Sequence, residues 1–395
     1  MKKFLNFAPV NLTAILAVIF VCISIENCTA QSSNFKLSAI PSKYQISESS
    51  LAQYRQQADA AKSDAYDLTK SLPQGYVTDG SVDYAQPIQI GINSHANVIF
   101  PNFPILVSTK GLTVKSNTVL IFQNNSKIIL KPTDASAYQI FKVNNVQNVK
   151  IYFANIQGDR DHHIGSGGEW GMGINISGSS NIQIINPKVA NCWGDGIYLG
   201  KAGNAVNNNI DILYAQLDNN RRNGISIICS NGLNLTSPLV SNTNGTPPMA
   251  GIDIEPNDNS DEINDVNIKS ATTFNNEYGI IIELDRLSGQ SAKNVNVNIV
   301  NHIDDGSKTG LCYLLAKPNA ANANYSGTIS VVDPVWKNNQ KAGFVNVKSA
   351  QTGLNLKFSN VKVFKKDGNG GDVSDEPQLL KIKDVMKKDL KADVN

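Results

Sequence analysis

The sequence predicts an all-β solenoid, a parallel β-helix, over residues 76–364. Two patterns indicate this fold: a Gly-Ile unit with polar–apolar alternation recurs every 23–33 residues, and a second apolar-x-apolar unit recurs out of phase with it. Short strands that repeat at such intervals, with no helical stretch between them, are typical of solenoid coils. Single-strand β-sandwich repeats are the alternative, and the Asn residues between the two units favour the β-helix.

The Gly-Ile units place two columns of apolar side chains inside the solenoid. Side chains alternate along a strand, so the residue after each Gly and the residue two positions later point the same way. The first column comprises Ile174, Ile197, Ile225, Ile252 and Ile280, and the second comprises Ile176, Leu199, Ile227, Ile254 and Ile282. Asn residues at the bends tolerate left-handed geometry, and stacked Asn side chains can hydrogen-bond from coil to coil.

Two flanking segments accompany the solenoid. Residues 31–75 are predicted to form a linker and a helix from Ser47 to Leu72, which Pro73-Gln74-Gly75 ends. We expect a helix to cover the open N-terminal end, because a cap protects exposed strand edges. Residues 365–395 form a charged C-terminal tail, either a cover or a frayed end.

The first thirty residues are typical of a secretory signal peptide. Two lysines precede an apolar run, Ala14–Ile25, and small residues precede Gln31, so we expect cleavage after Ala30 and a secreted or periplasmic protein. A retained membrane anchor and a surface lipoprotein modified at Cys28 are the alternatives. The three cysteines that remain after cleavage form neither a disulfide framework nor a zinc site.

The composition excludes several classes of protein. Lys and Arg total 35 and Asp and Glu total 33, and a net charge of +2 argues against binding nucleic acid or a membrane by bulk electrostatics. A hydrophobic content of 41% excludes wholesale disorder. Beyond the N-terminus no run of about 18 apolar residues occurs, which excludes an integral membrane protein of the helical type. We expect a monomer.

The start of the solenoid resembles the N-terminal part of the pectate lyase-like superfamily. The matching residues are Thr78-Asp79-Gly80, Pro87-Ile88-Gln89 with Ile92, Asn97-Val98-Ile99-Phe100-Pro101, Ile105-Leu106-Val107-Ser108 and Gly111-Leu112-Thr113-Val114-Lys115-Ser116-Asn117-Thr118. The resemblance implies a right-handed parallel β-helix, with a capping helix and the first coils in this stretch. The superfamily includes lyases, polygalacturonase-like hydrolases, epimerases and phage tailspikes, so the fold leaves the chemistry open. Gly194-Asp195-Gly196-Ile197 looks like the polygalacturonase strand that carries paired Asp residues, but has one Asp.

A group of carboxylates is predicted on the outward face of the Gly-Ile strands. Asp253 and Glu255 lie two residues apart on one strand, and Glu283 stacks beside Glu255 on the next coil. Carboxylates this close repel, so one should have a raised pKa or share a cation. General acid–base catalysis and Ca²⁺ binding both use such groups. We predict Asp195, Asp253 and Glu255 as the catalytic residues; a solvated face balanced by arginines is the alternative.

Other residues near this face are candidates for substrate binding. Arg side chains bind uronate carboxylates bidentately, and aromatic rings stack on sugar faces. A polar, Gly-rich insertion over residues 158–171 is long enough for a binding loop. The candidates are Arg221, Arg222, His162, His163, Glu169, Trp170, Trp193, Tyr198 and Glu283.

The predicted function is that of a polysaccharide-degrading enzyme, a glycoside hydrolase acting on an acidic or neutral polysaccharide, without cofactor or metal. One alternative is a uronate lyase, in which Arg222 or His162 removes the proton. Its substrate carboxylate would be neutralised by Arg or by Ca²⁺ bound to the three carboxylates of the wall. The other is a glycan-binding surface protein without catalysis.

Overall fold

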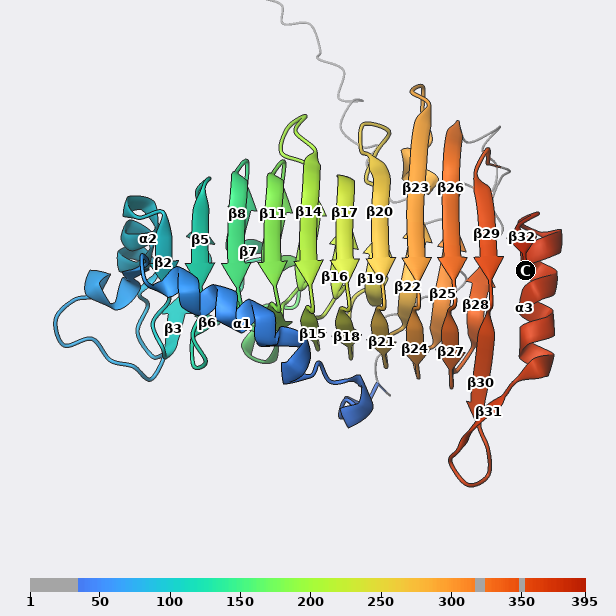
Figure 1. The fold of residues 1–395 in the computed structure, drawn as a ribbon, viewed down its shortest axis with the longest axis horizontal. Helices are drawn as coiled ribbons and strands as arrows, with labels where there is room; N and C mark the ends of the chain where they lie inside the picture. Colours follow the sequence, from blue (N-terminus) through green and yellow to red (C-terminus); the bar gives the residue numbers. More distant parts are fainter. Residues whose placement is uncertain (1–34, 317–323, 348–351) are drawn as a thin grey trace, which may run out of the picture. The chain divides into compact units, whose positions relative to one another are not determined.

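The computed structural model describes residues 35–316, 324–347 and 352–395, and the predicted signal peptide (residues 1–30) lies outside them. The described chain winds into three sheets whose neighbouring strands come from successive coils (Figure 1). Pairing from coil to coil is parallel, as where Ile174 pairs with Ile197 and Ile197 with Ile225. The fold is the predicted right-handed parallel β-helix. None of the described helices is long and apolar enough to cross a membrane.

The three sheets are named here by their strand numbers in the described part of the chain. The twelve-stranded sheet contains β1 (Tyr66–Asp67), β2 (Asn97–Ile99), β5 (Thr118–Ile121), β8 (Gln147–Tyr152), β11 (Ser180–Ile185), β14 (Asn207–Leu213), β17 (Ser230–Thr236), β20 (Ile263–Lys269), β23 (Lys293–Val300), β26 (Tyr325–Val332), β29 (Asn355–Ser359) and β32 (Asp393–Val394). The nine-stranded sheet contains β4 (Leu112–Thr113), β7 (Ala137–Asn144), β10 (Trp170–Ser177), β13 (Ile197–Gly200), β16 (Ile225–Ile227), β19 (Ala250–Ile254), β22 (Tyr278–Glu283), β25 (Thr309–Leu314) and β28 (Ala342–Asn346). The eleven-stranded sheet contains β3 (Pro104–Val107), β6 (Lys127–Leu130), β9 (Asn155–Gln157), β12 (Lys188–Ala190), β15 (Gln216–Asp218), β18 (Leu239–Ser241), β21 (Thr272–Phe274), β24 (Ile303–Asp305), β27 (Val335–Lys337), β30 (Lys362–Lys366) and β31 (Asp372–Ser374).

Short helices flank these sheets. The α-helices are α1 (Glu48–Lys62), α2 (Ala85–Ser94) and α3 (Glu376–Lys388), and the 3₁₀ helices are η1 (Ser42–Tyr44), η2 (Leu68–Ser71), η3 (Arg160–His162) and η4 (Asp285–Leu287).

The predicted apolar columns form the core of the nine-stranded sheet. Ile225 pairs with Ile252, which pairs with Ile280, and all three are fully buried. The bends also behave as predicted: Asn191 and Asn219 have φ values of 58° and 52°, and Asn219 donates to the Asn191 side chain over 2.8 Å. The repeat register is therefore confirmed for these coils.

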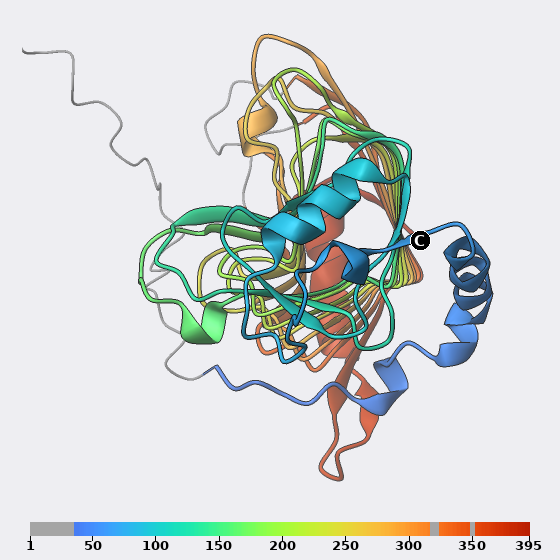
Figure 2. The ribbon, with the colours of Figure 1, turned by 90° about the vertical axis from the view of Figure 1, so that its left-hand side faces the viewer.

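Helix α1 differs from its prediction in length and in place. It ends at Lys62 rather than Leu72, and it lies along the side of the β-helix rather than over its end (Figure 2). Ala58 packs against Ile121 and Tyr152, whose side chains point outward from the twelve-stranded sheet. An apolar helix face needs an apolar partner, and this outward column supplies one.

The N-terminal cap is α2, within the stretch that resembles the pectate lyase-like superfamily. Its Ile88 and Ile92 are buried in the main core together with Leu68 and Phe100. This helix closes the N-terminal end of the solenoid, as the resemblance implied (Figure 2).

The C-terminal tail is a cover. Helix α3 buries Ile382 and Met386 in the main core, and Gln378 accepts a hydrogen bond from the backbone of Gly343 over 2.8 Å. The helix stands at the C-terminal end of the sheets in Figure 1. It thereby protects the last coil from pairing with another chain.

Candidate functional site

The candidate site lies on the outward face of the nine-stranded sheet. Tyr198 on β13, Ser226 on β16 and Asp253 on β19 are in register on successive coils. Glu255 follows β19 directly, and Glu283 is the last residue of β22. The predicted stacking of these residues is thus present.

Arg222 connects the carboxylates of this face. Its Nη2 donates to Glu255 Oε2 over 2.7 Å, and its Nη1 donates to Asp195 Oδ2 over 3.3 Å. The Arg222 side chain is only 12% exposed, so water screens these contacts little. The carboxylates hold the pKa of Arg222 above its ordinary value despite the opposing effect of burial.

Asp195 is held by the turn that enters β16. Its Oδ1 accepts from the Asn223 backbone N–H over 3.1 Å, and its Oδ2 accepts from the Ser226 hydroxyl over 2.9 Å. The side chain is fully buried, and burial raises its pKa to about 6, against the opposing effect of Arg222. Both oxygens of Asp195 therefore already have protein donors.

Asp253 is fully buried as well, and only one of its two carboxylate oxygens has a hydrogen-bond partner among the described residues. Its Oδ2 accepts from the Asn223 amide over 2.7 Å, whereas its Oδ1 accepts from no donor among the described residues. Burial raises the pKa of Asp253 well above its ordinary value, and the nearby carboxylate of Glu255 makes the second largest contribution. Burial and Glu255 likewise raise the pKa of Glu283 to about 7. Asp195, Asp253 and Glu283 therefore retain a proton more strongly than exposed carboxyls do.

The burial of Asp195 and Asp253 does not agree with the alternative that these outward residues form a solvated face. Outward side chains of a β-helix are covered wherever a neighbouring turn folds over them, and here the turn carrying Arg222 and Asn223 does so. Glu255, whose side chain is 12% exposed, and the partly buried Glu283 are the carboxyls of this group that solvent reaches.

Tyr198 lies beside this group as predicted and is partly buried. Its ring lies along the strand over Gly200, where a Cβ atom would come within 2.4 Å of the ring. Burial raises the pKa of Tyr198, so its hydroxyl remains protonated and can donate.

The Gly-rich insertion folds back onto the protein around Asp159. Its carboxylate accepts from the Tyr138 hydroxyl over 2.6 Å and from His163 Nδ1 over 2.8 Å. The His163 imidazole is fully buried and stacks on Trp193 with ring centroids 3.8 Å apart. His163 thus anchors the insertion, and its side chain does not face solvent.

Trp193 and Arg221 also bind this insertion. The Arg221 guanidinium lies 3.8 Å from the Trp193 ring centroid and donates to the carbonyl of Gly168 over 2.8 Å, and Trp193 Nε1 donates to the carbonyl of Gly167. The predicted sugar-stacking role of Trp193 is therefore replaced by packing under the loop.

The other predicted binding residues of the insertion are more exposed to solvent than the buried carboxylates of the candidate site. His162 on η3 is exposed, and Trp170 at the start of β10 is 56% exposed. Glu169 is partly buried, close enough to Arg221 to affect its pKa. Trp170 is the aromatic side chain of this group that a ligand could reach.

Asn223 is a site residue that the sequence interpretation missed. It binds both Asp195 and Asp253, and its Oδ1 accepts from the Ala250 backbone over 3.0 Å. Asn223 precedes Gly224 as Asp195 precedes Gly196, so alignment of the repeats would have indicated that the two residues stack. A metal centre is not formed by the described residues, among which no group of three or more His, Cys, Asp or Glu side chains is placed to hold an ion.

Solved structures share this architecture. The chain is similar to the endo-xylogalacturonan hydrolase of Aspergillus tubingensis, with a TM-score of 0.53 and 14% identity over 75% of this chain and 84% of that one. It is also similar to a mutant tailspike protein of E. coli bacteriophage HK620 in complex with a pentasaccharide, with a TM-score of 0.57 and 13% identity over 78% and 58% of the chains. The chain shares the right-handed parallel β-helix of these proteins. At these identities, the likeness concerns the fold.

Sequence comparison adds two proteins of Bacillus subtilis. The uncharacterized protein YclG is 31% identical over 201 residues, which cover 44% of this chain and 34% of that protein. The SPbeta prophage-derived uncharacterized protein YorA is 26% identical over 162 residues, 37% of this chain and 28% of that protein. The matches thus span about a third of the length of these relatives. No protein-family model matches the sequence.

Proposed function

We propose that the protein hydrolyses glycosidic bonds of a polysaccharide at the carboxyl cluster, which consists of Asp195, Asp253, Glu255 and Glu283. One observation carries the proposal: four carboxyls lie close together around the Arg222 guanidinium, which pairs with Asp195 and Glu255 and whose charge also opposes the rise in the pKa values of Asp253 and Glu283. Glycoside hydrolysis needs one protonated and one ionised carboxyl beside the bond. Proteins of this fold include a xylogalacturonan hydrolase and a pentasaccharide-binding tailspike, which supports a polysaccharide as the substrate.

Within this group, Glu283 serves as the general acid and Glu255 as the base or nucleophile. A pKa of about 7 keeps much of Glu283 protonated at neutral pH, and both side chains reach solvent. Asp195 and Asp253, which the sequence interpretation assigned to catalysis, are positioning residues because they are fully buried. Glu255 lies close enough to Asp253 to raise its pKa, and a protonated Asp253 can donate to Glu255 and so orient it.

The hydrogen bonds that Arg222 already forms with carboxylates favour hydrolysis over elimination. A lyase needs a base beside the substrate and a cation for the uronate carboxylate. Both Nη atoms of Arg222 already bind carboxylates, and the His163 imidazole is buried. The remaining candidate base, His162, lies on the exposed side of the insertion.

The substrate is a neutral polysaccharide. Four carboxyls lie beside two guanidiniums, those of Arg222 and the exposed Arg286, so the cluster carries excess negative charge once the carboxyls ionise. A chain of uronates would place further carboxylates beside it, and like charges at close range repel. Hydroxyls of a neutral sugar can instead donate to Glu255 and accept from Tyr198.

A panel of neutral and uronate polysaccharides tests the proposal. Reducing ends released from a neutral polymer, without absorbance from an unsaturated uronate and without loss of activity in a chelator, are expected. An unsaturated product would indicate the lyase, and binding without any release of reducing ends would indicate a glycan-binding protein.

Secretion after cleavage behind Ala30 remains part of the proposal. Mass spectrometry of the mature protein should find Gln31 at its N-terminus. A lipid-modified Cys28 would make the protein a surface lipoprotein instead.

A further inference from the structure

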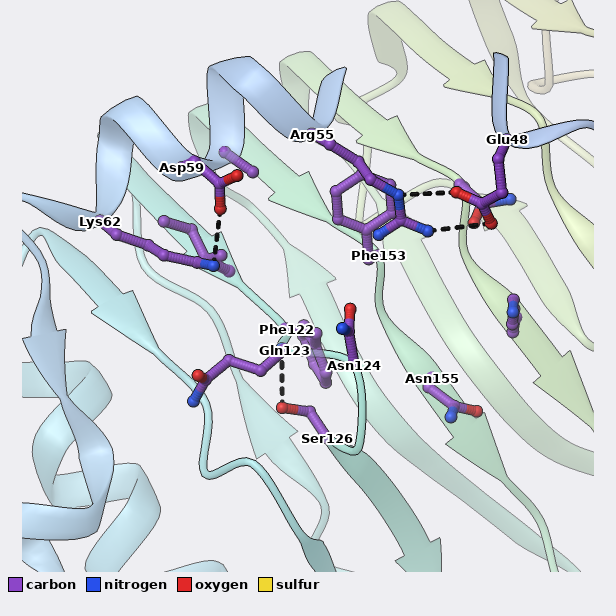
Figure 3. A pocket seen from close by; sticks show the side chains of 14 residues that line it. Glu48, Arg55, Asp59, Lys62, Phe122, Gln123, Asn124, Ser126, Phe153 and Asn155 are labelled. Carbon is purple, nitrogen blue, oxygen red and sulfur yellow. Dashed lines mark hydrogen bonds and ion pairs between the residues drawn. The ribbon is translucent and has the colours of Figure 1, made fainter. Parts of the chain in front are cut away.

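A cavity lies under α1, away from the carboxyl cluster. It has a volume of about 580 Å³, within the range of small-molecule sites, and it opens between the helix and the bends that join the twelve- and eleven-stranded sheets (Figure 3). The apolar side of α1 packs on Ile121 and Tyr152, and its charged side overhangs this space. The cavity therefore exists because only the apolar side of the helix packs against the sheet.

The roof of the cavity is formed by two ion pairs on α1. Arg55 binds Glu48 with two hydrogen bonds of 2.8 and 3.1 Å, and Lys62 binds Asp59 at 2.7 Å. Each cation is already neutralised by its own carboxylate, so the roof offers hydrogen-bond donors and acceptors with little net charge.

The floor of the cavity carries amide side chains that have no hydrogen-bond partner in the described part of the chain. Asn124 and Asn155 line it, and the side chain of neither forms a hydrogen bond with another described residue. Figure 3 shows both amides on the side of the space that faces α1. Each amide has two donors and an acceptor free for a ligand.

Phe153 supplies an apolar wall in a strained conformation. Its φ of 60° lies in the left-handed region, where bulky residues are rare, and the corresponding bend one coil later is Asn186. The Arg55 guanidinium lies 4.7 Å from the Phe153 ring centroid. The ring packs beside the apolar cluster that contains Ile121 and Tyr152, and it forms part of the lining of the cavity.

We propose that this cavity binds a short neutral oligosaccharide. The cavity lies on a different face of the β-helix from the carboxyl cluster. Free amides, two ion pairs, the ammonium of Lys188 and an apolar ring match a sugar, which combines hydroxyls that accept hydrogen bonds with an apolar C–H face. Binding in this cavity does not depend on the proposed hydrolysis.

Hydrogen exchange tests the site, because it locates binding along the chain. The protein carries Glu255→Gln and Glu283→Gln to prevent cleavage, and cellotriose, xylotriose and maltotriose are the probes. At least one trisaccharide should slow exchange in residues 48–62 and 121–126. Combined Asn124→Ala and Asn155→Ala replacement should raise the concentration for half-maximal protection roughly tenfold, the effect of losing two hydrogen bonds.

A matched control replaces Asn298 and Asn355 by Ala, since these outward amides also lack described partners but lie outside the cavity. It should leave protection unchanged, and both double variants should melt like their parent. The inference is overturned if no neutral trisaccharide protects residues 48–62, if the Asn124/Asn155 variant is protected equally well, or if only a galacturonate trimer binds there.

Discussion

Arg222 on one coil donates through Nη2 to Glu255 Oε2 on the next coil over 2.7 Å, and through Nη1 to Asp195 on the coil before. One guanidinium thus spans three coils of the nine-stranded sheet. Because it is mostly buried with them, the carboxyls depend on it both for charge balance and for position.

Replacement of Arg222 by Met should destabilise the protein by about 3–5 kcal/mol at pH 7, because it leaves buried carboxylates without a cation. The loss should shrink at pH 5, where raised pKa values keep Asp195 and Asp253 neutral. Denaturant unfolding at both pH values measures this. Lys131→Met removes a cation at an exposed position that forms no ion pair with a described residue; it is the control and should change stability by less than about 0.5 kcal/mol. Equal stability of Arg222→Met and wild type would contradict the role of the guanidinium.

Glu283→Gln should change how stability depends on pH. The pKa of Glu283 is raised from 4.5 to about 7, so the folded protein holds a proton that the unfolded chain releases between these values. Stability of the wild type therefore falls as pH rises through this window, and the variant lacks this contribution. Its melting temperature relative to wild type should rise from pH 5 to pH 8. Glu262→Gln, at an exposed position, is the control; parallel curves for Glu283→Gln and wild type would refute the raised pKa.

Ile252→Asp should cost several kcal/mol, because it places a charge in the middle of a fully buried column. Thermal unfolding measures the loss. Ile164→Asp makes the same change at a side chain that is 71% exposed and should melt like wild type. If the Ile252 variant also melts like wild type, the assigned coil register is wrong.

The sequence predicted the parts of the fold that repeat with a clear period. Strands such as β13 of the nine-stranded sheet and β14 and β20 of the twelve-stranded sheet bury two alternating apolar residues, so their registers could be derived from the Gly-Ile and apolar-x-apolar units. Strands of the eleven-stranded sheet are often three residues long with one inward side chain, such as Leu217 in β15, and leave no alternation to detect. Helix α1 was placed wrongly because amphipathicity identifies its apolar face but not the surface that receives it.

For the candidate site, the sequence predicted which residues share a face but not how deeply they lie. Alternation places Asp253, Glu255 and Glu283 outward together. The burial of Asp253 depends on the turn that carries Arg222 and Asn223, and the course of a turn follows from tertiary contacts rather than from strand periodicity.

Release of reducing ends by Glu255→Gln and Glu283→Gln tests the proposed hydrolysis most directly. Each substitution keeps the side-chain shape and removes ionisation, so each should lower the rate on a neutral polysaccharide by roughly 10²–10⁴-fold. Glycan binding should persist, and Glu262→Gln should be as active as wild type. Asp253→Asn, a change at a positioning residue, should shift the pH profile and retain part of the activity. Full turnover by both the Glu255 and the Glu283 variant, on a polymer that the wild type cleaves, would contradict the account.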